Sequence, residues 1–379
     1  MRILFWSELF WPYIGGAEVV GAKLLPALQA RGYEVAVVTS HDHLELPDED
    51  RYNGIPIYRF PFRTALAEGN ITQLVRDRHR LAELKRTLAP ELIHLNALGP
   101  SFLFNLQTAD AHPPPLLVTL HTVYDLIDSA QIEGRDTLLQ NTLRSAAWVA
   151  CVSEAVLHDA RRRAPMITRS SSIVYNGLDE PNILPKPLPL AAPRLLCLGR
   201  LTTVKGFDLV LSAFSMLINR FPLVRLVMAG DGPMRPALQA QTSQLGLGDR
   251  VEFTGWVAPD KVPELINTAT AVLMPSRREG FPLVGIQAAQ MARPIVASRA
   301  GGLPELILHE KTGLLVERES IESLAEAIAF LLDRPDRARQ MGEAARRRVQ
   351  EIFSLERCVN EYDARYRKLT RKFPYVESA

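Results

Sequence analysis

Short apolar runs alternate with amphipathic segments over most of the chain. The first runs are RILFWS, EVAVVTS and IPIYRF, and LIHL, LLVTLH, WVACVS and SSIVY follow them. Continuous apolar runs separated by helical patterns are typical of strands that are buried on both faces of a parallel sheet. The alternation therefore predicts an α/β protein with helices on both sheet faces and ligands at the carboxyl ends of the strands.

A proline-rich segment interrupts this alternation near the middle of the chain. Residues 181–193 (PNILPKPLPLAAP) hold five prolines in thirteen residues, a density that neither a helix interior nor a central strand tolerates. The alternation then restarts with RLLCLG, RLVMAG, VEFTG, AVLMPS, PIVAS and GLLVE. At 379 residues the chain is long enough for two domains. We predict two doubly wound, Rossmann-like domains, residues 1–180 and 194–353, joined by a linker over 181–193.

The polar stretch from Ser40 to Gly54 is predicted to be a loop. Its DED, residues 48–50, has two readings: a metal-binding Asp-x-Asp, or an acidic segment in contact with solvent. We favour the solvated segment, because no third ligand lies nearby in the sequence.

Charge and cysteine content exclude several classes of partner. The chain has 44 basic and 42 acidic residues, a net charge of +2, so nothing demands a nucleic acid. Its three cysteines lie far apart and show no CxxC spacing, which predicts neither a disulfide framework nor a zinc site. No run of 18 apolar residues occurs, and the apolar N-terminus is interrupted by Glu8. We expect a cytoplasmic protein that begins with a strand rather than a signal peptide.

The segment GRLTTVKG, from Gly199 to Gly206, is the first candidate for chemistry. Arg200 lies at the end of a predicted strand, and Lys205 comes directly before a predicted helix. A cation at a helix N-terminus is unfavourable, so an anion is expected to compensate it. Two cations and a helix dipole suit a diphosphate, whose charge rises when it becomes a leaving group. Solvated surface cations are the alternative.

The segment SRREGFPLVGIQAAQMA is the second candidate. Glu279 precedes a predicted helix whose first amides, from Leu283 and Val284, are free to hold phosphate oxygens. Glu279 would then face sugar hydroxyls, while Gln287 on the helix reaches a ribose. The plainer alternative is a capping acid and a surface glutamine. Farther along, AGGLPELI (residues 300–307) presents a second glycine pair after a strand, as another anion-ready loop.

Two weaker motifs lie in the first half of the chain. IGGAE places Gly15 and Gly16 between the first strand and a helix, where a backbone can approach an anion. The motif is not GxGxxG, so a dinucleotide oxidoreductase has little support. His121 ends the strand LLVTLH; a structural role and a role at the carboxyl edge of the sheet are about equally supported.

In combination, these motifs resemble those of a known enzyme family along nearly the whole chain. They are, in order, IGGAE, VSE, VYNGLD, GRLTTVKG, AGDGP, VEFTGWV, PSRREGFPLVGIQAAQMA, AGGLPELI and KTGLLV. The chain resembles the retaining glycosyltransferases of family 4. The resemblance implies the GT-B fold, two Rossmann-like domains facing a central cleft. It also implies that a C-terminal helix, about residues 354–379, crosses back to the first domain.

The resemblance also assigns roles to residues. Arg200 and Lys205 would stabilise the departing nucleoside diphosphate, so that no metal or other cofactor is expected. Glu279 would lie near the transferred sugar, and His121 would contact that sugar from the first domain. The implied donor-binding residues are Gly15, Gly16, Arg200, Lys205, Trp256, Val257, Glu279, Gly280, Phe281, Pro282, Leu283, Val284 and Gln287. The family pattern has a second glutamate where this chain has Gln287, and an amide accepts hydrogen bonds without charge assistance.

The predicted function is therefore retaining, metal-independent transfer of a hexose from a nucleotide-diphosphate sugar to a hydroxyl acceptor. The acceptor would be a sugar, a lipid-linked sugar or a small molecule, in the synthesis of a polysaccharide, glycolipid or other glycoconjugate. The alternatives are a sugar-nucleotide 2-epimerase and a catalytically silent nucleotide-sugar binding protein. The basic runs RDRHR (residues 76–80) and RRR (residues 161–163) leave open a peripheral contact with the inner face of the membrane. Donor base, acceptor and oligomeric state stay open.

Overall fold

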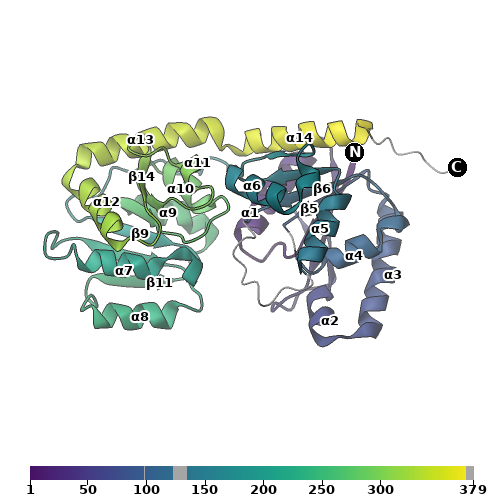
Figure 1. The fold of residues 1–379 in the computed structure, drawn as a ribbon, viewed down its shortest axis with the longest axis horizontal. Helices are drawn as coiled ribbons and strands as arrows, with labels where there is room; N and C mark the ends of the chain where they lie inside the picture. The colour runs from purple at the N-terminus through teal and green to yellow at the C-terminus, as the bar shows by residue number, and fades with distance from the viewer. Residues whose placement is uncertain (98, 123–134, 373–379) are drawn as a thin grey trace. The chain divides into compact units, whose positions relative to one another are not determined.

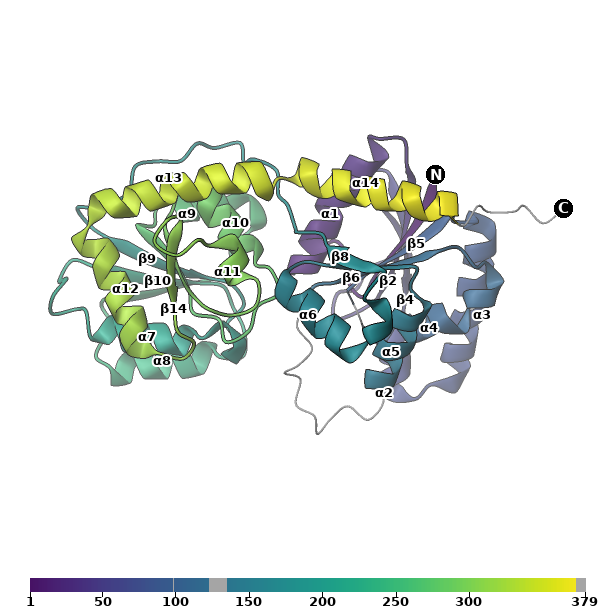
Figure 2. The ribbon, with the colours of Figure 1, turned by 45° about the horizontal axis from the view of Figure 1, so that its top comes forward.

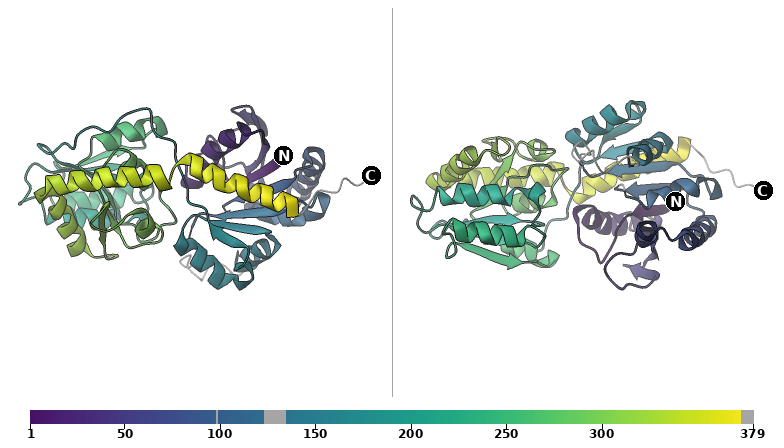
Figure 3. Two further views of the ribbon diagram at one scale, coloured as in Figure 1. Left: turned by 90° about the horizontal axis from the view of Figure 1, so that it is seen from above. Right: turned by 60° about the horizontal axis from the view of Figure 1, so that its bottom comes forward.

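The chain folds into two compact α/β units, each described here by itself. The computed structural model describes residues 1–97, 99–122 and 135–372. The first unit comprises Met1–Asn176 with Leu355–Ala379, and the second comprises Gly177–Ser354 (Figure 1). Helices cover both faces of the sheet in each unit (Figures 2 and 3). This architecture confirms the fold class that the alternation of apolar runs predicts. The proline-rich segment 181–193 holds neither helix nor strand.

The first unit is built on an eight-stranded sheet in the order β3-β4-β2-β1-β5-β6-β7-β8. The strands are β1 (Arg2–Ser7), β2 (Glu34–Ser40), β3 (Glu49–Tyr52), β4 (Ile55–Phe60), β5 (Leu92–Asn96), β6 (Leu116–Leu120), β7 (Trp148–Cys151) and β8 (Ser171–Ile173). The helices are α1 (Gly16–Gln29), α2 (Phe62–Glu68), α3 (Ile71–Leu88), α4 (Phe102–Gln107), α5 (Arg135–Ser145), α6 (Glu154–Arg163) and α14 (Leu355–Lys372). Side chains of Asn70 and Ser153 cap the first turns of α3 and α6.

The prediction of a loop from Ser40 to Gly54 is wrong in part. Residues 49–52 form β3, which pairs antiparallel with β4 at the edge of a sheet whose other pairs are parallel. Asn53 and Gly54 both have positive φ, at 50° and 82°, and connect the two strands. An Asn-Gly pair between two strands is a strong hairpin signal, and the sequence contained it. The DED segment is ion-paired, since Asp50 binds Arg59 and Asp48 binds Arg80.

Helix α14 packs within the first unit. Its apolar side chains belong to the same buried cluster as side chains of β1, β2 and α1; they are Leu355, Cys358, Val359, Tyr362, Tyr366 and Leu369. Two tyrosine hydroxyls anchor the helix to the sheet. His94 Nδ1 lies 2.6 Å from the hydroxyl of Tyr366, and Thr119 Oγ1 lies 2.9 Å from that of Tyr362. The last seven residues of the predicted helix, 373–379, lie outside the described residues.

The buried His94 gives the first unit a pH-dependent stability. Burial, helped by the nearby His121, lowers the pKa of His94 to about 3, whereas an unfolded histidine titrates near about 6.5. Between these values the unfolded chain binds a proton that the folded unit does not. We therefore expect the free energy of unfolding to fall as the pH drops from 6.5 toward 4.

Calorimetric melting of the wild type and His94→Gln between pH 7.5 and 4.5 measures this dependence. The variant should lose less thermal stability over that range than the wild type does. Exposed His79, replaced by glutamine, is the control and should leave the dependence unchanged. Equal pH dependence in the wild type and His94→Gln would contradict the expectation.

The second unit is built on a six-stranded parallel sheet in the order β11-β10-β9-β12-β13-β14. Its strands are β9 (Arg194–Leu198), β10 (Arg225–Ala229), β11 (Val251–Gly255), β12 (Ala271–Met274), β13 (Ile295–Ser298) and β14 (Gly313–Val316). Its helices are α7 (Phe207–Ser215), α8 (Arg235–Gln244), α9 (Val262–Asn267), α10 (Leu283–Gln290), α11 (Leu303–Leu306), α12 (Ile321–Asp333) and α13 (Pro335–Ile352).

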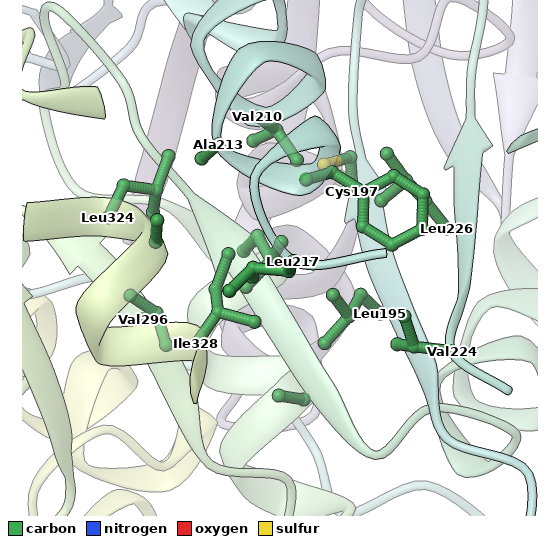
Figure 4. Close-up of a cluster of buried hydrophobic side chains, with 14 of the residues drawn as sticks. Leu195, Cys197, Val210, Ala213, Leu217, Val224, Leu226, Val296, Leu324 and Ile328 are labelled. Atoms are coloured by element: carbon green, nitrogen blue, oxygen red, sulfur yellow. The ribbon is translucent and has the colours of Figure 1, made fainter. Parts of the chain in front are cut away.

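The core of the second unit fills the space between its sheet and the helices α7 and α12. Figure 4 shows Cys197 of β9 beside Val210 of α7, with Leu195 of β9 and Ile328 of α12 in the same cluster. These side chains are almost fully buried. Cys197, like the other two cysteines of the chain, is buried and free.

The strand orders place a topological switch point in each sheet. In the second unit, β10 and β11 extend the sheet to one side of β9, while β12 to β14 extend it to the other. In the first unit, β2 lies on one side of β1 and β5 on the other. Loops that leave the carboxyl ends of two such neighbouring strands diverge, and ligands of α/β proteins bind between them. Gly15 and Gly16 follow β1, Arg200 and Lys205 follow β9, and Glu279 follows β12.

Candidate functional site

An ion pair at the switch point of the second unit joins two of the predicted site residues. Lys205 ends the short 3-10 helix Thr203–Lys205 after β9, and Glu279 lies in the loop after β12. Lys205 Nζ lies 2.7 Å from Glu279 Oε2, and the hydroxyl of Ser276 donates to the same oxygen at 3.2 Å. The sequence predicted that an anion compensates the cation ahead of α7. In this structure Glu279 is that anion.

Two glycines make the close approach of these loops possible. Gly206 has φ 67°, and a Cβ there would lie 2.2 Å from the carbonyl oxygen of Pro275. Gly301 has φ 50°, and a Cβ there would lie 1.6 Å from the carbonyl oxygen of Glu279. The next amide, of Gly302, donates to the carbonyl oxygen of Gly280 at 3.0 Å. The loop AGGLPELI thus supports the backbone around Glu279, a role that its glycine pair did not reveal in the sequence.

Helix α10 begins at Leu283, as the sequence predicts, and no side chain caps its first turn. The plainer alternative for Glu279, a capping acid, is therefore wrong, since this carboxylate binds Lys205 and Ser276 instead. Gln287 lies on α10 and is half-buried, and its side chain makes no hydrogen bond with the described residues. Among the described residues, no side chain therefore caps the first-turn amides or bonds to the Gln287 amide.

The remaining predicted residues of the second unit lie in three places. Arg200 follows β9; its side chain is exposed and pairs with no described residue. Trp256 and Val257 follow the edge strand β11, where Trp256 is exposed and Val257 half-buried. The residues between Glu279 and α10 are buried, and the first residues of α10 are half-buried; they are Gly280, Phe281 and Pro282, and then Leu283 and Val284.

Arg277 is a residue whose role at this site the sequence analysis missed. Its guanidinium makes two hydrogen bonds to the carboxylate of Asp208 on α7, at 2.7 and 2.8 Å, and a third at 2.7 Å to the carbonyl oxygen of Thr203. Its backbone N–H donates to the carbonyl oxygen of Val204 at 2.8 Å. Arg277 therefore ties the loop of Lys205 to the loop of Glu279.

The ion pair between Arg277 and Asp208 stabilises the charged form of both side chains. Burial by itself raises the pKa of Asp208, but the hydrogen bonds and charge of Arg277 outweigh it and hold the pKa below its usual value. The hydrogen bonds to Asp208 in turn raise the pKa of Arg277. Arg277 lies inside the quoted motif PSRREGF, but its partner lies 69 residues away in the sequence, so no local pattern marked the pair.

The predicted residues of the first unit follow two strands of its sheet, Gly15 and Gly16 after β1 and His121 after β6. Gly15 precedes α1, whose first turn has no side-chain cap, and a Cβ at Gly16 would meet no atom within 4 Å. Packing within the unit therefore leaves the space at Gly16 open. His121 Nε2 lies 2.7 Å from Oδ1 of Asn96, whose Nδ2 donates to the carbonyl oxygen of Ala17 at 3.1 Å. Asn96, which the sequence analysis missed, thus connects His121 with the start of α1.

Burial lowers the pKa of His121 to about 4. The imidazole is consequently neutral near pH 7, so it offers a ligand a hydrogen bond but no positive charge. The residues that follow Thr122, from 123 to 134, lie outside the described residues.

The described part of the chain contains no group of three or more His, Cys, Asp or Glu side chains that could hold a metal ion. The acidic DED segment is not such a group. Metal independence itself stays a prediction.

Family models cover most of the chain in two parts. A model described as "Glycosyltransferase Family 4" matches residues 14–180, and one described as "Glycosyl transferases group 1" matches residues 182–348. The border between the two matches falls at the start of the proline-rich segment.

Individual proteins agree with these models. The chain is 26% identical over 384 residues to N-acetyl-alpha-D-glucosaminyl L-malate synthase of Bacillus anthracis, covering 95% of this chain and 96% of that protein. It is 37% identical over 161 residues to a GDP-mannose-dependent alpha-(1-6)-phosphatidylinositol monomannoside mannosyltransferase of Mycobacterium tuberculosis, covering 41% of this chain and 42% of that protein.

Solved structures show the same fold. Sucrose-phosphate synthase from Thermosynechococcus elongatus aligns with a TM-score of 0.86 at 24% identity, over 98% of this chain and 100% of that one. Anabaena HepE in complex with UDP aligns with a TM-score of 0.79 at 21% identity, over 97% of this chain and 100% of that one. The fold is therefore GT-B, and this chain belongs to glycosyltransferase family 4.

Proposed function

We propose that this glycosyltransferase moves a hexose from a nucleoside-diphosphate sugar to a hydroxyl acceptor, with retention of anomeric configuration and without a metal ion. The observation that carries the proposal is the Lys205–Glu279 pair at the switch point, beside the uncapped start of α10. A cation and free helix amides suit a diphosphate, and a neighbouring carboxylate suits sugar hydroxyls.

In the proposed reaction, the bond between the anomeric carbon and the diphosphate oxygen breaks, and its electron pair leaves with the diphosphate. Lys205 and Arg200 stabilise the growing negative charge on that leaving group. The acceptor hydroxyl attacks the same face of the sugar, which explains retention, and its proton passes to the departing diphosphate. The chain supplies electrostatics and positioning, with Glu279 and the neutral His121 orienting the sugar.

The names of solved neighbours support a nucleotide-sugar donor. Anabaena HepE has been solved in complex with UDP, with UDP and glucose, and with UDP-glucose. The mycobacterial relative, in contrast, is named as GDP-mannose-dependent. We propose a nucleoside-diphosphate hexose, with the exposed Trp256 and half-buried Val257 beside the base.

Incubation of the protein with a UDP- or GDP-sugar and a panel of hydroxyl acceptors in EDTA tests this proposal. The expected product is a glycoside with the donor's anomeric configuration, identified from the one-bond C–H coupling of its anomeric carbon. Conversion of donor without any acceptor into a sugar with inverted C2 would instead identify a 2-epimerase. Donor binding without turnover across the panel would identify a silent binding protein.

Gln287 gives a graded test of donor binding. An amide oxygen accepts hydrogen bonds from ribose hydroxyls about 1 kcal/mol less strongly than a carboxylate does. We therefore expect Gln287→Glu to tighten the donor Kd by about fivefold, and Gln287→Ala to weaken it, in calorimetric titrations. Gln241, which bonds within its own unit, serves as the control through Gln241→Ala. An inert wild type that becomes active only as Gln287→Glu would refute the proposal that the natural site works.

We further propose that the protein acts in the cytoplasm and touches the inner face of the membrane peripherally. None of the described helices is long and apolar enough to cross a membrane. The side chains of the basic run RRR bond within the first unit. Arg161 donates to Ser171, and Arg162 and Arg163 form ion pairs with Asp159. The run on α3 is more open, because Arg76 and Arg78 are exposed on the helix that begins with Ile71, whose exposed fraction is 74%.

Sedimentation with vesicles tests this contact. The protein should bind vesicles that contain anionic lipid better than neutral ones, because a basic residue near an anionic surface contributes about 1 kcal/mol. Arg76→Glu with Arg78→Glu should abolish that preference. The control is Arg339→Glu with Arg347→Glu on α13, and a loss of equal size in the control would argue against an α3 contact.

A further inference from the structure

Three neighbouring strands of the first unit each lead to a charged side chain in one cluster. Glu8 follows β1, Asp42 follows β2, and Arg63 follows β4 in the first turn of α2. Since β4, β2 and β1 are adjacent and parallel, their carboxyl ends meet at one edge of the sheet. This edge also carries Gly16, at the other end of the loop that Glu8 begins. Ligands of α/β proteins collect at such edges.

The guanidinium of Arg63 lies between the two carboxylates without a hydrogen bond to either. Its Nη1 is 3.6 Å from Asp42 Oδ2, and its Nε is 4.0 Å from Glu8 Oε1. The side chain is 41% exposed and donates no hydrogen bond to any residue in the described ranges. Its N–H donors are thus held in place by charge and remain available to an oxygen of a ligand.

The surrounding structure fixes the carboxylate of Glu8 and the backbone at Asp42. Glu8 accepts from the backbone N–H of Ser101 at 3.1 Å and from the hydroxyl of Ser40 at 3.4 Å, and its side chain is only 15% exposed. The backbone N–H of Asp42 donates to the hydroxyl of Tyr13 at 3.1 Å, which holds the start of that loop. Acceptors and donors therefore converge on one spot before any ligand binds, which lowers the entropy cost of binding.

The charge of the cluster decides which ligand fits. The cluster holds two carboxyl groups, those of Glu8 and Asp42, but only one guanidinium, that of Arg63. A carboxylate or phosphate group would be repelled. A hydroxyl group suits the cluster, because it can donate to a carboxylate and accept from the guanidinium at once.

We propose that Asp42, Arg63 and Glu8 bind hydroxyl groups of the acceptor, and that this acceptor is a neutral polyhydroxyl compound, a saccharide, rather than an anion. The inference rests on the proposed glycosyl transfer, because only a transferase needs a second substrate. It adds the chemical class of that substrate and the residues that select it.

Binding measured separately from turnover tests the inference. Full-length protein, saturated with the nucleoside diphosphate that it binds, is titrated with methyl glucoside and methyl N-acetylglucosaminide and with the anions malate and glucose 6-phosphate. Saturation-transfer NMR reports binding. The variants are Asp42→Asn and Arg63→Met, which leave the Glu8–Ser101 contact intact. Matched controls are exposed residues of the same unit, replaced as Asp110→Asn and Arg86→Met.

The wild type and both controls should bind at least one of the neutral glycosides and neither anion. Asp42→Asn and Arg63→Met should weaken that binding at least tenfold while their nucleotide affinity stays unchanged. The inference is overturned if an anion binds better than every neutral glycoside, if no glycoside binds, or if the two variants bind as the wild type does. Failure of the proposed function has another signature, the absence of nucleotide-sugar binding in the wild type itself.

Discussion

Replacing Lys205 with alanine is expected to slow sugar transfer by about a hundredfold to a thousandfold, the usual cost of removing one preorganised group that stabilises developing charge. The loss should appear mainly in kcat, because the charge on the diphosphate grows as it leaves the sugar. Glu279 would also lose its ion-pair partner, whose Nζ lies 2.7 Å from Glu279 Oε2. Initial rates at saturating donor and acceptor measure the effect.

Lys261 provides the matched control for Lys205. It lies in another short 3-10 helix of the same unit, is exposed, and pairs with Glu264 three residues away. Surface ion pairs of this kind contribute little, so Lys261→Ala should keep the wild-type rate. If Lys205→Ala retains more than a tenth of the wild-type kcat, Lys205 does not stabilise the leaving group.

The largest expected effect on stability comes from Gly301→Ala. An added Cβ would lie 1.6 Å from the carbonyl oxygen of Glu279, and the φ of 50° is itself unfavourable for alanine. The backbone strain alone costs about 1 kcal/mol or more, and the clash forces one of the two loops to move. We expect the unfolding transition of the second unit to shift by about 3 kcal/mol or more, together with loss of transfer activity.

Gly246→Ala separates the clash from the backbone strain. Gly246 has φ 66°, similar to Gly301, but a Cβ there would meet no atom within 4 Å. This control should cost only the strain, about 1 kcal/mol, and leave activity intact. Thermal and urea unfolding followed by circular dichroism compare the two variants. Equal destabilisation by both would show that the contact between Gly301 and Glu279 is unimportant.

Much of the fold could be predicted because buried parallel strands appear in the sequence as continuous apolar runs. RILFWS, RLLCLG and AVLMPS became β1, β9 and β12, since strands covered on both faces exclude polar residues. Strand β3 escaped because it lies at an edge, where its alternate residues are exposed and polar. The Asn53–Gly54 pair was the available hairpin signal, but the loop was predicted from the polar composition of residues 40–54.

Residues of the candidate site stood out in the sequence where one short segment carries several of them. Lys205 and Glu279 stood out because each lies just after a strand and close to a helix start. Their direct contact was not foreseen, because the sequence analysis assigned the missing anion to a ligand. The contact between Arg277 and Asp208 depends on which strands are neighbours, and local sequence patterns do not specify this across 69 residues.

In the first unit, too, contacts between residues far apart in the sequence could not be predicted. His121 was singled out as a strand-end histidine, but Asn96, which holds its ring, lies on another strand and within an apolar run. The cluster of Glu8, Asp42 and Arg63 is likewise assembled from three separate loops. Glu, Asp and Arg are common surface residues, so the sequence alone does not mark these three. Only the fold shows that they lie together at one edge of the sheet.

The most direct test of a metal-free diphosphate site is calorimetric titration with UDP-, GDP- and ADP-sugars in EDTA. The wild type is compared with a variant that carries both Arg200→Ala and Lys205→Ala. We expect donors of one base to bind the wild type despite EDTA, and this binding to be lost in the double variant. Binding that requires a divalent metal, survives the double substitution, or is absent for every sugar nucleotide would contradict the account.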